Sequence, residues 1–123
     1  MRLTLAQTAL FASLWKRWRL SDDDLIALER QVMENPLAGP VVRNTGGVRK
    51  IRFSPPSRGR GKSGAYRVCD LYYPAHQIVY FVLIFPKSEQ PNLTSEQQKA
   101  CRQLAHEIEL MHRNADAFGR GQD

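Results

Sequence analysis

Eight of the eighteen lysines and arginines of this 123-residue chain lie between residues 35 and 69, and this stretch contains no aspartate or glutamate. Outside it, ten basic residues accompany twelve acidic ones, so the net charge of +6 comes from this one window. The stretch has the pattern of a basic strand, a loop with glycines at 59, 61 and 64, and the start of a second strand. Positive charge concentrated in this way favours a polyanionic partner, either a nucleic acid or an acidic protein surface.

Five of the cations are placed where they can act together. Lys50 and Arg52 are two apart on one strand and so share a face, while Lys62 lies in the loop, Arg67 on the next strand and Lys87 after a later strand. If the strands are neighbours, these groups converge on one concave surface that binds phosphate. They could also cleave RNA, whose 2′-hydroxyl is an internal nucleophile, by stabilising the charge that develops and by transferring a proton through lysine. A basic face that only binds is equally compatible with these residues.

Other kinds of site find little support in the sequence. The three histidines, at 76, 106 and 112, do not form a metal-binding set, and no cysteine stands in ligand spacing, so we expect no metal and no other cofactor. The segment 59–63 has the composition of a phosphate loop, but it lacks the Walker spacing and precedes a strand rather than a helix. A nucleoside triphosphate site is therefore not predicted.

The elements that must position the cations form one α+β domain over residues 1–123, with 114–123 expected as a frayed tail. Hydrophobic periodicity predicts strands at 3–8, 48–53, 66–73 and 78–85, and helices near 9–19, 21–35 and 94–112. The order β-α-α-β-β-β-α predicts a mostly antiparallel sheet of about four strands with helices packed on one face. The segment 78–85 is apolar throughout and is therefore predicted to be the central strand, covered on both sides.

Helix boundaries are marked by local signals. Ser21 followed by the acidic triplet 22–24 predicts a capped helix start, and Asn35-Pro36 predicts its end. Thr94 and Gln97 have capping-box spacing at the start of the last helix.

The chain has only two cysteines, no signal-peptide pattern and no apolar run long enough to span a bilayer, so we expect a cytoplasmic protein without membrane attachment.

The ordered motifs resemble a known family. Asn35-Pro36, GGVRKIRF at 46–53, GKSGAYRV at 61–68 and FPKSE at 85–89 are similar to the pattern of the RelE/HigB toxins of bacterial type II toxin–antitoxin pairs, most of all the HigB branch. The resemblance covers residues 3–112. It implies a small sheet packed with helices, and an endoribonuclease that enters the ribosomal A site and cuts mRNA there.

The resemblance also implies roles for individual residues. Lys50 and Arg52 match the basic pair on the second main strand, Arg67 the arginine that contacts the scissile phosphate, Lys62 the basic loop and Lys87 the basic position after the last strand. We expect Lys50, Arg52 and Lys87 to be candidates for proton transfer, with Arg67 and Lys62 stabilising the phosphate. The wider set expected to bind RNA is Arg49, Arg58, Arg60, Lys62, Tyr66 and Tyr73. For the tyrosines, packing within the sheet is an equally good reading.

Two positions depart from the family pattern. Phe85 stands where many relatives have tyrosine and Ser88 where asparagine is common, and the C-terminal tyrosine that some members use in catalysis has no counterpart. The identity of the general base therefore stays open.

The expected partners are the ribosome, mRNA and a cognate antitoxin, a HigA-like helix-turn-helix protein. Two alternatives remain: a non-catalytic toxin of the same fold that acts on DNA gyrase, as in the ParE branch, and a basic nucleic-acid-binding accessory protein without toxicity.

Overall fold

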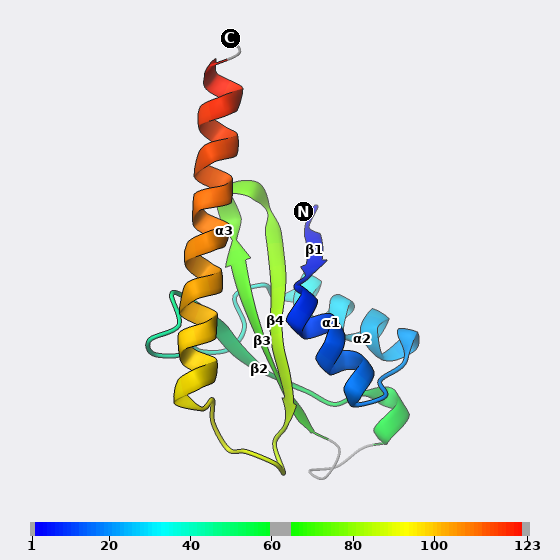
Figure 1. Ribbon diagram of the computed structural model, residues 1–123. Helices are drawn as coiled ribbons and strands as arrows, with labels where there is room; N and C mark the ends of the chain where they lie inside the picture. Colours follow the sequence, from blue (N-terminus) through cyan, green and yellow to red (C-terminus); the bar gives the residue numbers. More distant parts are fainter. Residues whose placement is uncertain (1, 60–64, 122–123) are drawn as a thin grey trace.

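The protein is built around one four-stranded sheet whose strands run in the spatial order β1-β4-β3-β2 (Figure 1). The computed structural model describes residues 2–59 and 65–121, with side chains up to residue 118. The strands are β1 (Thr4–Gln7), β2 (Arg49–Phe53), β3 (Tyr66–Tyr73) and β4 (Ile78–Pro86). Strand β4 is antiparallel to β3 and parallel to β1, and β3 is antiparallel to β2. The predicted α+β class, element order and mostly antiparallel sheet are confirmed.

The described residues form three α-helices beside the sheet, and each begins at a cap that the sequence encodes. They are α1 (Ala9–Arg17), α2 (Asp22–Glu34) and α3 (Ser95–Gly121). Thr8 Oγ1 accepts from the amide of Phe11 at the start of α1. At α2, Ser21 and Asp24 form a capping box, and Thr94 and Gln97 form the predicted one before α3. These side chains satisfy amide groups that a helix N-terminus leaves without partners.

The helices are divided between the two faces of the sheet, whereas the sequence led us to expect them on one face. Helices α1 and α2 cover one core that contains Phe11, Leu28 and Phe81. Helix α3 covers a second core on the other face, where Cys101 and Ile108 pack with Leu83 of β4. Figure 1 shows the sheet between α3 and the α1–α2 pair. The reason lies in β4, because an apolar strand in the middle of a sheet must be covered on both faces.

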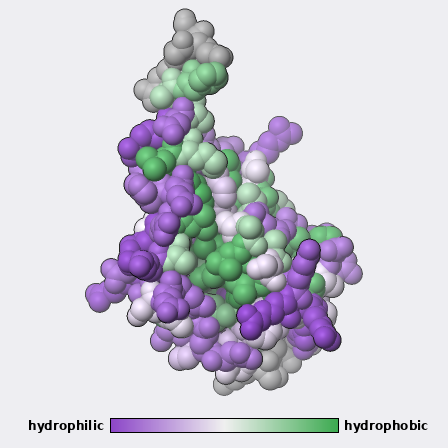
Figure 2. Space-filling model, viewed as in Figure 1, coloured by the Kyte–Doolittle hydropathy of each residue, from purple (hydrophilic) through white to green (hydrophobic). Residues whose placement is uncertain are grey.

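The distribution of hydrophobic residues on the molecule, seen from the same side, is consistent with these two layers of helices. Hydrophobic residues gather in the region between α3 and the α1–α2 pair, and hydrophilic residues cover much of the surface around it (Figure 2). Within the described residues, none of the helices is both long and apolar enough to cross a membrane.

Helix α3 continues to Gly121, beyond the boundary near residue 112 that the sequence suggested. Its later turns are held to the β3–β4 hairpin by aromatic rings and hydrogen bonds. Tyr80 and His112 are joined by a hydrogen bond of 2.7 Å, and the His112 ring stacks on the rings of Tyr73 and His76, with centroids 4.4 Å from each. His76 also pairs with Asp116 at 3.3 Å. These contacts carry the helix past the expected end; residues 122 and 123 of the expected tail lie outside the described residues.

The free edge of β2 is covered by the segment that follows α2. The amide of Lys50 donates to the carbonyl of Pro40, and that of Val42 donates to the carbonyl of Val48. The chain approaches β2 so closely at Gly39 that an added Cβ would lie 2.3 Å from the Lys50 carbonyl oxygen. Gly39 also has a φ of +81°, which L-residues rarely adopt. Only glycine fits this position without displacing the strand.

Gly39→Ala therefore tests how firmly this segment is fixed. We expect it to lower the free energy of unfolding by about 2–4 kcal/mol, because the backbone strain of a positive φ is added to an overpacked contact. Gly59→Ala is the matched control, since Gly59 has a φ of +73° with nothing within 4 Å of an added Cβ. Equal losses for the two variants in urea unfolding would show that the close approach to β2 contributes nothing.

Candidate nucleic-acid interface

A cleft of about 560 Å³ opens at the β2 edge of the sheet, and three predicted cations line it. Arg52 of β2 lies directly opposite Arg67 of β3, and Lys50 shares the face of Arg52 because it is two residues away. The sheet thus brings together Lys50, Arg52 and Arg67, as the alternation predicted.

The other wall of the cleft comes from two segments that are distant in sequence. Gln31 of α2 donates from Nε2 to the carbonyl of Arg52 at 2.7 Å, and Ala38, Gly39 and Pro40 line the cleft beside it. The Pro91-Asn92 segment before α3 closes the other side, with Asn92 Oδ1 3.4 Å from Lys50 Nζ. Among the described residues that line the cleft, backbone and amide groups rather than carboxylates therefore accompany the cations.

The cations of the cleft have no anionic partner in the described part of the chain, where the ion pairs are His76–Asp116 and Arg113–Glu109. Arg67 is half-buried, and its Nη1 is buried without a hydrogen-bond partner. A buried guanidinium donor without an acceptor lowers the stability of the fold. Two arginines and a lysine around one opening provide the donors that a phosphate requires.

Arg49 has a structural task instead of a place in the cleft. Its Nη1 donates to the carbonyl oxygens of Leu37 at 3.3 Å and Gly39 at 3.0 Å, and so fixes the wall from behind. Asp70 lies opposite it on β3, almost fully buried, with Oδ1 lacking a partner. Burial raises the pKa of Asp70 to about 7, although the positive charge of Arg49 acts in the other direction. Arg49 thus supports the site without facing it.

The basic loop is anchored at its first end by a buried carboxylate. Asp24 accepts hydrogen bonds from the amide of Ser57 at 3.0 Å, from Ser57 Oγ at 2.6 Å and from the amide of Ser21 at 2.9 Å. Burial alone raises the pKa of Asp24, but the bonds from Ser57 and Ser21 outweigh it and hold the pKa below its ordinary value. Arg58, in the short 3-10 helix η1 (Pro56–Arg58), donates to the carbonyls of Trp18 and Arg19 at the end of α1. Both contacts fix the point from which the loop departs.

Comparison with known proteins identifies the fold and its lineage. Residues 3–116 match the family model described as "RelE toxin of RelE / RelB toxin-antitoxin system". The chain belongs to the RelE toxin family. A solved structure of E. coli toxin RelE, a double arginine-to-alanine mutant in the free state, superposes with a TM-score of 0.50 at 16% identity. The match covers 74% of this chain and 90% of that one, and it shows a shared fold.

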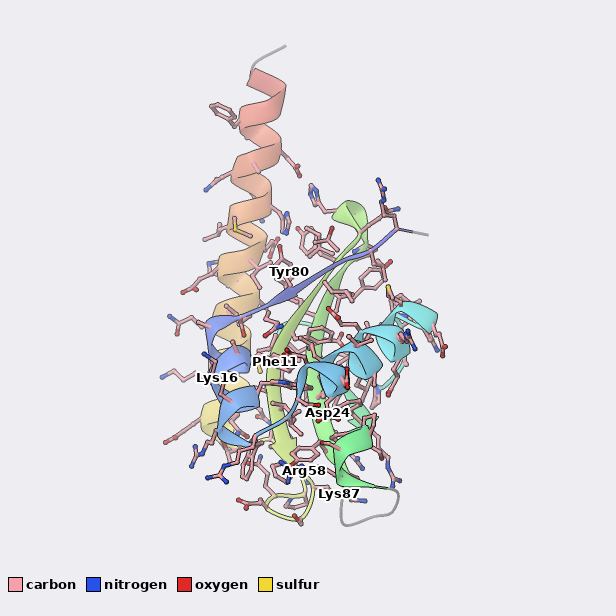
Figure 3. The ribbon with its side chains drawn as sticks, turned by 90° about the vertical axis from the view of Figure 1, so that its right-hand side faces the viewer. Phe11, Lys16, Asp24, Arg58, Tyr80 and Lys87 are labelled. Carbon is pink, nitrogen blue, oxygen red and sulfur yellow. The ribbon has the colours of Figure 1, made fainter. Side chains whose placement is uncertain are left out.

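Lys87, which was expected to act with the cations of this RelE-family site, is not among the described residues that line the cleft. It is exposed just after β4, and its amide donates to the carbonyl of Ala65. Figure 3 shows Lys87 and Arg58 toward the end of the molecule away from Tyr80. Arg60 and Lys62 lie outside the described residues.

The two tyrosines expected to contact RNA are placed differently from that expectation. Tyr66 is buried in the α1–α2 core with its ring against Trp18, so it is not presented to a base. Adjacent strand residues point to opposite faces, and Tyr66 therefore points away from the face of Arg67. Tyr73 stacks on His112 near the β3–β4 hairpin, where it secures α3. We therefore leave both out of the proposed site of this RelE-family protein.

Gln31 and Asn92 were not singled out in the sequence, although both line the cleft of this RelE-family protein. Each is a common polar residue outside any motif, and only the fold brings α2 and the segment before α3 to the edge of β2. Asp24 was predicted as a helix cap, which is confirmed. Its second role, holding Ser57, has no local signal because the two residues are 33 positions apart.

Asp24→Asn tests the anchor of the basic loop. We expect a loss of about 1–3 kcal/mol in the free energy of unfolding near pH 7, because an amide cannot accept all three hydrogen bonds. The folded-state pKa is lowered, so the carboxylate stabilises the protein above its unfolded pKa of about 4 and loses this effect as the pH falls through the folded value. The difference between the variant and the wild type should therefore shrink below pH 4. Asp23→Asn, an exposed first-turn neighbour, is the control, and an equal loss for both would contradict the anchor.

Proposed function

We propose that this protein is a ribosome-dependent endoribonuclease that arrests translation by cutting mRNA without a metal. The observation that carries the proposal is the cleft lined by Lys50, Arg52 and Arg67, whose charges have no anionic partner among the described residues. Membership of the RelE toxin family supports a toxin role.

The proposed reaction uses the RNA as its own nucleophile. The 2′-oxygen attacks the adjacent phosphorus and loses its proton, the bond from phosphorus to the 5′-oxygen breaks, and that oxygen leaves with the electron pair and takes up a proton. The products are a 2′,3′-cyclic phosphate and a 5′-hydroxyl. Arg67 and Arg52 stabilise the charge that builds on the phosphate oxygens in the transition state, where fixed donors act most strongly.

Proton transfer falls to Lys50 among the residues that line the cleft. The described lining contains no histidine, carboxylate or tyrosine, and arginine does not deprotonate in proteins, which leaves the lysine amine. At the position where many relatives have tyrosine, Phe85 is buried in the α3 core and offers no hydroxyl. Lys87 follows the strand end outside this lining, so we place it on the path of the RNA rather than at the reacting phosphate.

Partners follow from the same proposal. We infer a cognate antitoxin, as the RelE/RelB description of the family implies, and a HigA-like helix-turn-helix protein is the form suggested by the motifs of the HigB branch. The ribosome and mRNA are the targets, and the cytoplasm is the compartment where they meet. Salt should weaken the encounter of the basic face with either RNA or an acidic antitoxin segment.

Arg67→Ala should lower the rate of mRNA cleavage by about 100- to 1,000-fold, the usual effect of removing one transition-state donor. Growth arrest on expression should be relieved in parallel. Arg113→Ala, on the exposed surface of α3, is the matched control and should remain toxic. Circular dichroism and thermal unfolding of the purified variants show whether each is folded, and Arg52→Ala repeats the test at an exposed position. Full cleavage by a folded Arg67→Ala protein would refute the assignment of the site.

Ribosome dependence needs a separate measurement. Primer extension on a reporter mRNA after brief expression should show cuts within the reading frame, and these should vanish when translation is blocked. Arrest with uncut mRNA would refute the proposal and point to a binding toxin, with DNA gyrase the next target to assay.

A further inference from the structure

Part of the cleft lining has a chemistry that phosphate binding does not require. Beside the three cations, the cleft is lined by the amide residues Gln31 and Asn92 and by Pro40 and Pro91. Contacts to phosphate hold a nucleic acid in register but carry no sequence information, whereas contacts to base edges do. The amide groups of asparagine and glutamine, each with a donor and an acceptor, are typical readers of base edges.

Asn92 is held in place by its neighbours. Gln90 Nε2 donates to the carbonyl of Asn92 at 2.8 Å and to Gln97 Oε1 at 2.8 Å, and Gln97 belongs to the capping box of α3. Leu93, the next residue, is buried in the α3 core. The exposed Asn92 side chain is thus presented from a segment fixed on both sides, which limits the entropy lost when it binds a ligand.

The hydrogen bonds already made leave complementary groups free in the described part of the chain. Asn92 Oδ1 accepts from Lys50 Nζ, so its Nδ2 remains a donor for a ligand. Gln31 Nε2 donates to the Arg52 carbonyl, so its Oε1 remains an acceptor. The cleft therefore offers one amide donor and one amide acceptor beside the cations, with proline rings as apolar surface.

We propose that Asn92 and Gln31 contact the edge of the nucleobase next to the bound phosphate and thereby set which nucleotide is preferred at the cut. This inference rests on the proposed ribonuclease function and adds a sequence preference to it. Single-stranded RNA is suited to such reading, because its unpaired bases expose their edges to side chains. The volume of about 560 Å³ lies within the range of pockets that hold small ligands such as one nucleotide.

The test measures preference rather than rate. A set of reporter mRNAs carries each of the four nucleotides in turn at every position of one codon, and cleavage there is quantified in a translating extract. The wild type should favour one nucleotide at one position by about tenfold or more, as expected for hydrogen bonds to a base edge. Asn92→Ala and Gln31→Ala should each reduce this ratio severalfold, with the loss confined to the favoured RNA. Gln103→Ala, an exposed glutamine of α3, is the control and should keep the ratio.

Asn92→Asp separates base reading from support of Lys50. The aspartate keeps an oxygen for Lys50 Nζ but has no Nδ2 donor, so base reading predicts a lowered preference ratio whatever happens to the overall rate. A ratio that stays at the wild-type value in Asn92→Asp, Asn92→Ala and Gln31→Ala would overturn the inference, as would a wild type without preference, and both results leave the ribonuclease proposal intact. A wild type that cuts no mRNA would overturn the ribonuclease proposal, and the inference with it.

Discussion

Burial of β4 on both faces is the constraint on which the rest of the structure depends. The strand lies between β1 and β3, and its side chains enter two separate cores. One core requires α1 and α2, and the other requires α3. The connections that bring these helices into place also carry the 38–40 and 91–92 segments to the edge of β2. The cleft is therefore assembled at the outer edge of the sheet as a result of how its middle is covered.

The cations of the cleft work against the local stability of the sheet. Arg52 and Arg67 are directly opposed on neighbouring strands, and like charges in such a pair repel. The fold tolerates this arrangement because its stability comes from the two cores and from caps such as Thr8 and Asp24. Arg49, next to Lys50 on β2, is bound differently from the cations of the cleft. Its guanidinium donates hydrogen bonds to two backbone carbonyl oxygens, whereas Arg52 and Arg67 have no anionic partner in the described residues.

Local patterns in the sequence were sufficient for the order of the elements and for the placement of the three cations that line the cleft. Alternation placed Lys50 and Arg52 on one face and Arg67 on the neighbouring strand, and capping residues marked the helices. Interactions between distant segments were not accessible in this way. Nothing in the sequence near Gln31 or Asn92 indicates that they lie close to β2. The sequence also does not distinguish Arg49 from its basic neighbours, because its hydrogen bonds to the carbonyls of Leu37 and Gly39 depend on the fold. Tyr66 is different, because its alternation with Arg67 already implied that the two side chains point apart.

The opposed Arg52–Arg67 pair also has a thermodynamic consequence. A polyanion that binds the cleft of the folded protein but not the unfolded chain raises the melting temperature by mass action. Here it would also reduce the repulsion between Arg52 and Arg67. Occupancy of the cleft and heat resistance of the whole domain are thus coupled, so that any ligand able to neutralise these two arginines also acts as a stabiliser of the fold.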